Sequence, residues 1–124
     1  MSPVSQTLGE QFAHAVAAKD HDQVRALLHP DLDFRAMTPR RIWEAPDADG
    51  VVDALNTWFG DTDHIEELEA VELDAFADRE RVGYRLRIRN EDGENLVEQQ
   101  AYLSERDGQI GWLRIMCSGY RPIG

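Results

Sequence analysis

Cysteine is nearly missing from this chain of 124 residues, because Cys117 is the only one. A single cysteine forms no disulfide within the chain, which favours a reducing compartment. Residues 1–6 lack the basic and apolar regions of a signal peptide, and no apolar run approaches the ~18 residues of a membrane span. We therefore expect a cytoplasmic protein that does not cross a membrane.

Positive charge is also scarce. Lys and Arg number 13 against 24 Asp and Glu, which gives a net charge of -11, and Lys19 is the sole lysine. A surface this acidic repels phosphate backbones and anionic lipids. The composition therefore argues against nucleic acid or a membrane surface as a partner.

The sequence motifs of metal sites, phosphate sites and catalytic serines are absent too. The four histidines and the lone cysteine show no His-x-x-x-His or Cys-x-x-Cys spacing. The chain has no phosphate-binding glycine loop and no Gly-x-Ser-x-Gly sequence. We expect no metal ion and no cofactor.

The segment Arg81–Ser118, by contrast, has a strong strand pattern. Apolar residues alternate with arginines in its first part, so the two kinds of side chain lie on opposite faces. The apolar face holds Val82, Tyr84, Leu86 and Ile88, and the other face holds Arg85, Arg87 and Arg89. Asp92-Gly93 and Asp107-Gly108 mark reversals, because glycine accepts the positive φ of a tight hairpin. The segment predicts three antiparallel strands, with the arginines on a solvated or carboxylate-paired face rather than in an anion site.

Three amphipathic helices are predicted before this segment. The first has an apolar stripe and begins at Ser2 or Ser5. Asp20 caps the second, with Gln23 in the capping-box position, and Asp49 caps the third. Among the residues expected in the core are Phe12, Val16, Leu27, Leu28, Phe34, Leu55 and Phe59.

The order of the elements predicts the fold class. Further strands are expected at Leu32–Ala36, Arg41–Glu44 and Ile65–Phe76, although Ile65–Glu69 alone would also suit a helix. Helices therefore dominate the first half of the chain and long strands the second. This order predicts an α+β fold in which three helices pack on the concave face of a strongly curved antiparallel sheet and form a cone. With no linker or repeat, we expect residues 1–124 to form a single domain, whose cone mouth is the natural ligand cavity.

Two parts of the chain carry a resemblance to a known family. Phe12–Asp22 runs into Val24–Phe34, and the hairpin Asp107–Ile110 precedes the last strand. Through these segments the chain resembles the nuclear transport factor 2-like (NTF2-like) superfamily, especially its SnoaL-like bacterial members, over nearly its whole length. The resemblance implies a cone-shaped α+β barrel, a fold that carries isomerases, dehydratases, epoxide hydrolases, cyclases and non-catalytic modules.

The catalytic residues of these enzymes have no counterpart at the matching positions. Steroid isomerases of this fold use a Tyr, an Asp base and a second acid, where this chain has Phe12, Ala36 and Gln100, or Gln99 if the register slips. The last strand, Trp112–Cys117, lacks the Asp of the epoxide hydrolases, and the histidines are scattered rather than paired as in the dehydratases. The resemblance therefore predicts the fold better than any one of these activities.

The lengths of the turns decide which side chains face the cone. A two-residue Asp107-Gly108 loop pairs Tyr102 with Leu113, Gln100 with Ile115 and Glu98 with Cys117. The resemblance implies that these six residues point inward, while Leu103, Trp112, Arg114 and Met116 point outward. At Asp92-Gly93, a three-residue loop puts Tyr84 and Leu86 inside, and a two-residue loop puts the arginines there. We favour the first, because the covering helices need an apolar partner.

Glu98 is the candidate catalytic residue. An apolar cone would suit it as a general acid or base, whereas a neighbouring arginine would make it part of a structural ion pair, the alternative that we favour. The other candidates for the ligand pocket are His14, Met37, Trp43, Trp58, Tyr84, Gln100, Tyr102, Leu113, Ile115 and Cys117.

These residues predict a protein that binds a small, mostly apolar molecule, with isomerase, lyase or hydrolase activity by acid–base chemistry as one form of that function. The alternative is a non-catalytic dimeric module whose pocket is filled by side chains. In either case we expect a homodimer through the outer sheet face, where Leu103, Trp112 and Met116 would otherwise form an exposed apolar patch.

Overall fold

The computed structural model describes residues 7–123 of the chain. Residues 1–6, which bear on the signal peptide and on a helix start at Ser2 or Ser5, lie outside the described part. The first helix begins at Leu8, with Thr7 as its N-cap, and the described helices are too short and too polar to cross a membrane.

The elements follow the order predicted from the sequence, with the short strand β7 in addition, and the α+β fold class is confirmed. In chain order they are α1 Leu8–Ala17, α2 His21–Leu27, β1 Leu28–Thr38, β2 Arg41–Ala45, α3 Ala48–Trp58, β3 His64–Phe76, β4 Arg79–Asn90, β5 Gly93–Arg106, β6 Gln109–Cys117 and β7 Arg121–Pro122.

Side-chain caps fix where α2 and α3 begin. The Asp20 carboxylate accepts a hydrogen bond from the backbone N–H of Gln23 at 3.1 Å, as predicted. The predicted cap of α3 at Asp49 is wrong, because Asp47 accepts from the N–H of Gly50 at 2.9 Å. Asp49 lies in the first turn instead and forms an ion pair with Arg25 at 2.8 Å.

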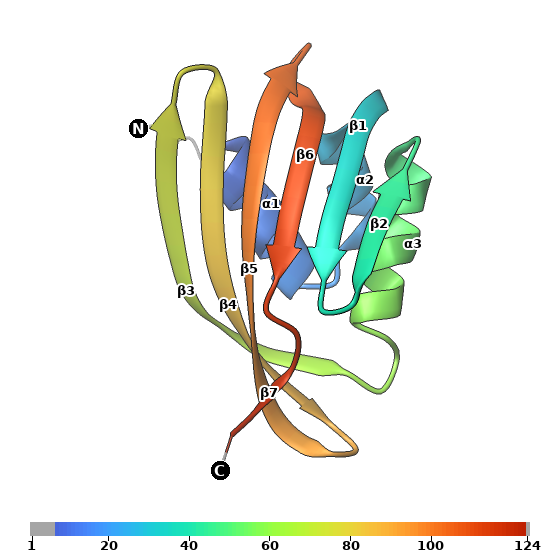
Figure 1. Ribbon diagram of the computed structural model, residues 1–124, viewed down its shortest axis with the longest axis vertical. Coiled ribbons are helices and arrows are strands. Elements are labelled where there is room, and N and C mark those ends of the chain that lie inside the picture. Colours follow the sequence, from blue (N-terminus) through green and yellow to red (C-terminus); the bar gives the residue numbers. More distant parts are fainter. Residues whose placement is uncertain (1–6, 124) are drawn as a thin grey trace.

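The main strands form one curved sheet in the order β2-β1-β6-β5-β4-β3, and β7 pairs with β5. All neighbouring pairs are antiparallel except β1 and β6, which are parallel. The three helices lie on one side of this sheet, here called the inner face, and the opposite side is the outer face (Figure 1). Strands β3, β4 and β5 bend strongly along their length, which gives the sheet its cone shape (Figure 1).

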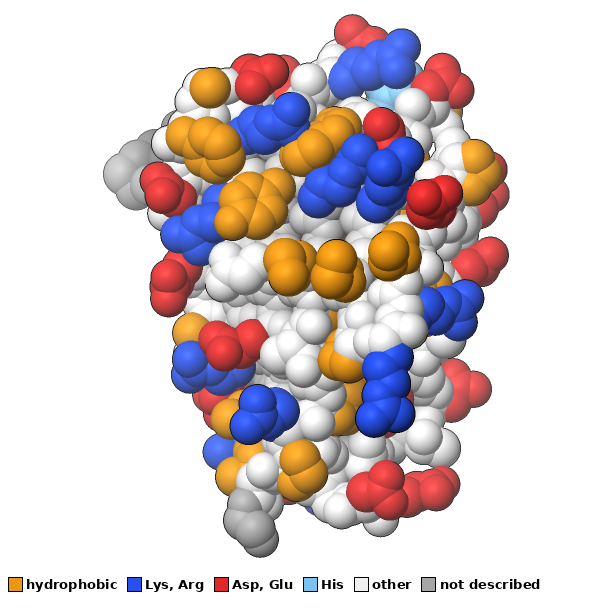
Figure 2. All heavy atoms as spheres, viewed as in Figure 1, with side chains coloured by type: hydrophobic (Ala, Val, Ile, Leu, Met, Phe, Trp, Pro, Cys, Tyr) orange, Lys and Arg blue, Asp and Glu red, His pale blue; other side chains and the backbone are white. Residues whose placement is uncertain are grey.

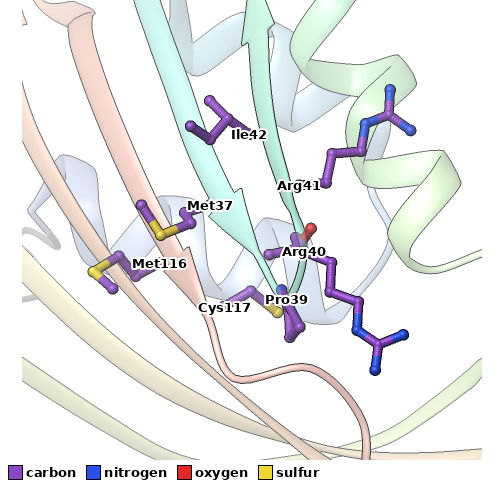
Figure 3. Close-up of a pocket in the computed structure, with 8 residues that line it drawn as sticks. Met37, Pro39, Arg40, Arg41, Ile42, Met116 and Cys117 are labelled. Atoms are coloured by element: carbon purple, nitrogen blue, oxygen red, sulfur yellow. The ribbon is translucent and has the colours of Figure 1, made fainter.

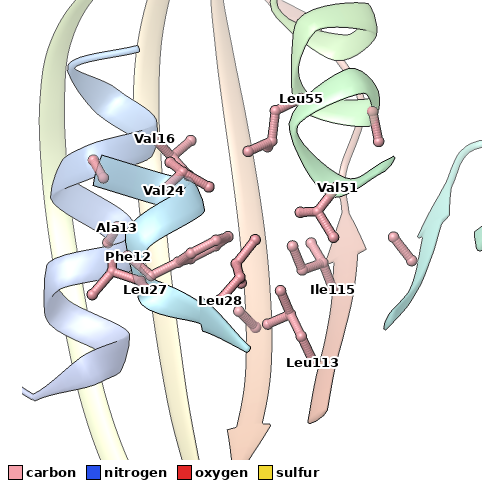
Figure 4. Packing of buried hydrophobic residues seen from close by; sticks show 14 of the residues in the cluster. Phe12, Ala13, Val16, Val24, Leu27, Leu28, Val51, Leu55, Leu113 and Ile115 are labelled. Atoms are coloured by element: carbon pink, nitrogen blue, oxygen red, sulfur yellow. The ribbon is translucent and has the colours of Figure 1, made fainter. Parts of the chain in front are cut away.

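The core fills the space between the helices and the inner face. Phe12 and Val16 of α1 and Leu55 of α3 are buried against the sheet, and Figure 4 shows Val51 of α3 beside Ile115 of β6. The full predicted core set is buried, namely Phe12, Val16, Leu27, Leu28, Phe34, Leu55 and Phe59.

The predicted pairing of the last two long strands is wrong by one residue. The two-residue Asp107-Gly108 loop is present, and Glu105 pairs with Ile110 beyond it. The next pair is Ser104 with Trp112, so Gly111 is an extra residue in β6, a β-bulge. A Cβ atom on Gly111 would lie 2.4 Å from the Cβ of Arg106, which explains why a glycine occupies the bulge.

Because of this bulge, the side chains of β5 that were predicted to face inward face outward, and those predicted to face outward face inward. Leu103, predicted to lie outside, pairs with Leu113 and is only 1% exposed on the inner face. Side chains in a strand alternate between faces, so a slip of one residue moves the whole set. Glu98, Gln100 and Tyr102 therefore lie on the outer face, and their predicted inward direction is wrong.

The turn between β4 and β5 is a second correction. Asn90 pairs with Gly93, so the loop has two residues instead of the predicted three. Tyr84 and Leu86 nevertheless lie inside and the arginines outside, as predicted. The two errors cancel, because the bulge at Gly111 had already reversed β5.

Candidate functional site

A row of polar side chains crosses the inner face at the end of β6. Tyr84 of β4 pairs with Gln99 of β5, and Gln99 pairs with Cys117 of β6. The hydroxyl of Tyr84 donates a hydrogen bond of 2.5 Å to Oε1 of Gln99, and both side chains are buried. We call Tyr84, Gln99 and Cys117 the inner polar row.

The amide nitrogen of Gln99 is the unusual group in this row. Gln99 is 0% exposed, and its Nε2 has no hydrogen-bond partner among the described residues. Its oxygen is engaged by Tyr84, which fixes the direction in which the amide N–H groups point. A buried donor without an acceptor costs about 1 to 3 kcal/mol, so this position favours an oxygen atom supplied by a ligand or by water.

The tyrosines around the row stay protonated. Burial raises the pKa of the Tyr84 hydroxyl far above its usual range, and the nearby Cys117 thiol raises it further. Burial also raises the pKa of Tyr120, with the carboxylate of Asp63 adding to the shift. The Tyr120 hydroxyl donates to the backbone oxygen of Trp58 at 2.7 Å. Both phenols can therefore donate hydrogen bonds without carrying charge at neutral pH.

Two tryptophans pack together between β2 and α3. Trp43 of β2 and Trp58 of α3 meet edge to face, with their ring centroids 5.7 Å apart. Nε1 of Trp43 donates to the Thr38 hydroxyl at 2.8 Å. Nε1 of Trp58 is buried and has no partner among the described residues. It is a second buried donor without an acceptor in the described part of the chain.

A hollow of about 610 Å³ opens where the β1–β2 turn meets the end of β6. It reaches the inner polar row at Cys117, which is half-buried and accepts a hydrogen bond from the N–H of Gly119 at 3.4 Å. Figure 3 shows Met37 and Met116 side by side, with the side chains of Arg40 and Arg41 extending away from them. The lining residues are Met37, Thr38, Pro39, Arg40, Arg41, Ile42, Met116 and Cys117.

Most apolar and aromatic candidates from the sequence lie on the inner side. Leu113 and Ile115 are buried there, Tyr84 and Cys117 belong to the inner polar row, and the two tryptophans pack on each other. Whether these residues bind a ligand stays a prediction.

The polar candidates of β5 have structural partners on the outer face. Glu98 forms an ion pair with Arg85 at 3.4 Å, with both side chains about half exposed. Gln100 accepts a hydrogen bond from Arg81 at 3.0 Å, and Tyr102 packs on Phe76. Glu98 is thus in the ion pair that we favoured, on the face opposite to the cone.

Two other candidates also lie away from the cone interior. His14 is exposed on α1, and Met37 is exposed on the outer face of β1, where it lines the hollow. Sequence reasoning did not place Gln99 on the inner face and gave Tyr120 no role. Gly111 was the available signal, because a glycine inside a strand is typical of a bulge and a bulge places Gln99 inward.

The described residues contain no group of three or more His, Cys, Asp or Glu side chains that could hold a metal ion. The inner polar row and its neighbours supply an amide, phenols, a thiol and indoles as hydrogen-bonding groups, and Arg40 and Arg41 line the adjoining hollow.

Comparison with solved structures identifies proteins that share this fold. No protein-family model matches the sequence, and no curated protein is significantly similar to it. A candidate isomerase from Rhodopseudomonas palustris superimposes with a TM-score of 0.75 at 10% identity, over 94% of this chain and 93% of that one. The chain has an NTF2-like fold.

Other solved structures with this NTF2-like arrangement carry different assigned activities. A candidate polyketide cyclase from Xanthomonas campestris has a TM-score of 0.69 at 16% identity, over 88% of this chain and 86% of that one. An epoxide hydrolase of the LEH-like type from M. tuberculosis has a TM-score of 0.66 at 15% identity, over 90% of this chain and 80% of that one. Members of this fold thus include isomerases, cyclases and hydrolases.

Proposed function

We propose that this protein binds a small, mostly apolar molecule at the mouth of its cone, against the inner polar row. The observation that carries the proposal is the amide Nε2 of Gln99, a fully buried donor that lacks an acceptor among the described residues. An oxygen atom on a ligand would satisfy this donor and recover the cost of leaving it unpaired.

The surroundings favour a neutral ligand with one acceptor oxygen. Tyr84 and Tyr120 stay uncharged, because burial raises the pKa of both hydroxyls. The inner polar row contains no carboxylate to pair with a cation and no basic side chain to pair with an anion, although Arg40 and Arg41 line the adjoining hollow. A ketone, ester or epoxide oxygen on an apolar skeleton matches the buried amide N–H, and Trp43 and Trp58 supply apolar area.

Binding fits this geometry better than acid–base catalysis by Glu98. Glu98 lies on the outer face in an ion pair with Arg85, on the far side of the sheet from the inner polar row. Structural neighbours include a candidate polyketide cyclase and an epoxide hydrolase, and the names of both refer to oxygen-bearing organic molecules. We infer the same broad class of ligand here.

The alternative is a module whose cone is filled by its own side chains. It is favoured by the burial of Trp58 and by the position of the 610 Å³ hollow, which contacts the inner polar row only at Cys117. Under this alternative, water satisfies Gln99 and no small molecule enters.

A pair of matched ligands and a pair of matched variants separate the two possibilities. Decalone and decalin share a carbon skeleton, but only the ketone carries an acceptor. We expect decalone to raise the melting temperature more than decalin, because only decalone pairs with Gln99. Decalone should also slow the reaction of Cys117 with iodoacetamide, a readout specific to the end of β6.

The control variants are neighbours in the sequence. Gln99→Leu should abolish the difference between the two compounds, whereas Gln100→Leu, on the outer face, should keep it. Equal and negligible effects of both compounds on wild type would favour the filled cone. If Gln99→Leu kept the difference in melting temperature between decalone and decalin, the ligand would bind at another site.

A further inference from the structure

The amide of Gln99 is closed off from solvent in this structure. Gln99 is 0% exposed, so the ligand proposed above reaches it only if part of the chain moves. It lies on β5, which is hydrogen-bonded to β4 on one side and to β6 on the other. The outer face, shown in Figure 2, is separated from Gln99 by this bonded sheet, whose strands lie only about 4.8 Å apart. The opening must therefore form on the inner side.

Residues 118–123 cross the inner side at this point, and we call them the strap. The strap follows Cys117 of the inner polar row and includes β7, which pairs with β5. Figure 1 shows it leaving β6 and running to the far part of the hairpin formed by β4 and β5. On the way, the Tyr120 hydroxyl donates to the backbone oxygen of Trp58 at the end of α3, and its ring lies 6.4 Å from that of Phe59. The strap is therefore attached to the sheet at both ends and to a helix in between.

Two buried donors without an acceptor among the described residues adjoin the strap. Gln99 is the pairing partner of Cys117, the residue directly before the strap. Trp58, whose Nε1 is the second such donor, is held by Tyr120 through its backbone oxygen. Burial is the main cause of the raised pKa of Tyr84 and Tyr120, and the Cys117 thiol adds to both, so it lies near both hydroxyls. Movement of the strap would therefore uncover the region between the two donors.

Surface contacts, rather than core packing, hold the strap in place. All six of its residues are exposed or half-buried. The backbone N–H groups of Ser118 and Ile123 donate to carbonyl oxygens of β5 at 2.9 Å each, and a bond of this kind contributes about 1 kcal/mol. Gly119 has a φ of 78°, a backbone conformation that glycine adopts without strain and that suits a hinge. Segments of this kind open locally at a much lower free energy than global unfolding requires.

We propose that the strap is a hinged cover over the inner polar row, with Gly119 as the hinge and the hydrogen bond from Tyr120 to Trp58 as the latch. The ligand enters between β5 and the end of α3 while the latch is open, and the closed strap keeps water from the Gln99 amide. This proposal rests on the ligand site proposed at Gln99 and adds the route by which the ligand arrives. It makes Tyr120 a residue that controls entry rather than affinity.

Solvent exchange of the two buried donors tests the cover without any ligand. Nuclear magnetic resonance follows the protons on Nε2 of Gln99 and on Nε1 of Trp58 separately. Tyr120→Phe keeps the ring and removes the latch, so both donors should exchange about fivefold faster. Tyr102→Phe makes the same change on the outer face and should leave both rates as in wild type. Because opening of the strap exposes little surface, a low urea concentration should not alter these rates.

Two results of this experiment would overturn the cover. One is exchange of either donor at the wild-type rate in Tyr120→Phe. The other is exchange that rises steeply with urea, which would mean that solvent reaches Gln99 only when the whole chain unfolds.

A removable lock on the strap tests entry of the ligand itself. Leu96 and Arg121 are cross-strand partners of β5 and β7, at a separation that a disulfide tolerates. A variant with Leu96→Cys, Arg121→Cys and Cys117→Ser can form one disulfide, which holds the strap closed. Its association with decalone, measured by tryptophan fluorescence, should be about tenfold slower or more when the variant is oxidised than when it is reduced.

The same measurement on Tyr120→Phe replaces the lock if that variant does not fold. Loss of the latch should speed association and dissociation by a similar factor and leave the affinity nearly unchanged. An association rate that is the same with and without the disulfide, or the same in Tyr120→Phe and wild type, overturns the cover. Failure of decalone to bind wild type counts against the ligand proposal alone, and the exchange rates of the two donors then decide for or against the cover.

Discussion

On the inner face of β4 and β5, Tyr84 and Gln99 are joined by a neutral hydrogen bond and are buried. One residue further along β4 and one residue back along β5, Arg85 and Glu98 form an ion pair whose side chains are about half exposed. The same backbone pairing thus carries two kinds of polar contact. A neutral pair tolerates burial because it has little hydration to lose, whereas buried charges lose much more, so charge stays on the side that water reaches.

The largest difference between the two faces should appear on truncation of apolar side chains. Phe12→Ala removes a fully buried ring on the side of α1 that faces the sheet. It should lower the free energy of unfolding by about 3 to 5 kcal/mol, because it leaves a cavity. Met37→Ala, on the outer face, should lower it by less than about 1 kcal/mol in the monomer. Urea unfolding measures both, at a protein concentration low enough to exclude dimers. A loss under about 1 kcal/mol for Phe12→Ala would contradict the assigned core.

The neutral pair on the inner face should behave as a coupled unit. Tyr84→Phe should cost about 1 to 3 kcal/mol, because it leaves the buried oxygen of Gln99 unpaired. Gln99→Leu leaves the Tyr84 hydroxyl unpaired but also removes a buried donor that has no partner among the described residues, so it should cost less. The double variant should cost clearly less than the sum of the two, since it removes both groups together. Strict additivity in this double-mutant cycle would mean that the Tyr84 to Gln99 hydrogen bond does not form in solution.

Alkaline pH should weaken the fold through the buried tyrosines. Burial raises the pKa of Tyr84 and Tyr120 in the folded state, so the folded protein keeps protons that the unfolded chain loses above its ordinary value near 10. The contribution to stability is complete below that value. It should fall by on the order of 1 kcal/mol per pH unit for Tyr84 as pH rises further. The loss should be smaller for Tyr120, because this half-buried side chain is partly screened by solvent.

Urea unfolding at increasing pH would measure this loss, and Tyr84→Phe provides the control. The variant should show a shallower decline above the ordinary tyrosine pKa than wild type. Tyrosinate absorbance that develops at the ordinary pKa for all three tyrosines of the folded protein would contradict the burial of these two.

The smallest effect is expected from the ion pair on the outer face. Glu98→Gln should change stability by about 1 kcal/mol or less, because solvent screens a pair whose side chains are about half exposed. Raising the salt concentration should reduce even this difference. A loss comparable to that of Tyr84→Phe would contradict the contrast between the two faces.

The sequence allowed prediction of the element order, the core and the face of β4, because these follow from hydrophobic periodicity and from local signals such as the Asp20 cap. It did not allow prediction of the inner polar row. That row depends on how β5 pairs with β6, and one inserted residue reverses the assignment although every local pattern is read correctly. Gln99 and Gln100 look equivalent in sequence, and only the bulge decides which of them is buried.

The bulge at Gly111 also bears on how proteins of this fold evolve. Without that one residue, and with Leu113 and Ile115 held inward, β5 would present Glu98, Gln100 and Tyr102 to the cone. A carboxylate, an amide and a phenol would then replace Gln99, Ala101 and Leu103 without a single substitution. A change in chain length of one residue is thus a route to a new interior, and an ungapped alignment of two such relatives would place non-equivalent residues in the same column.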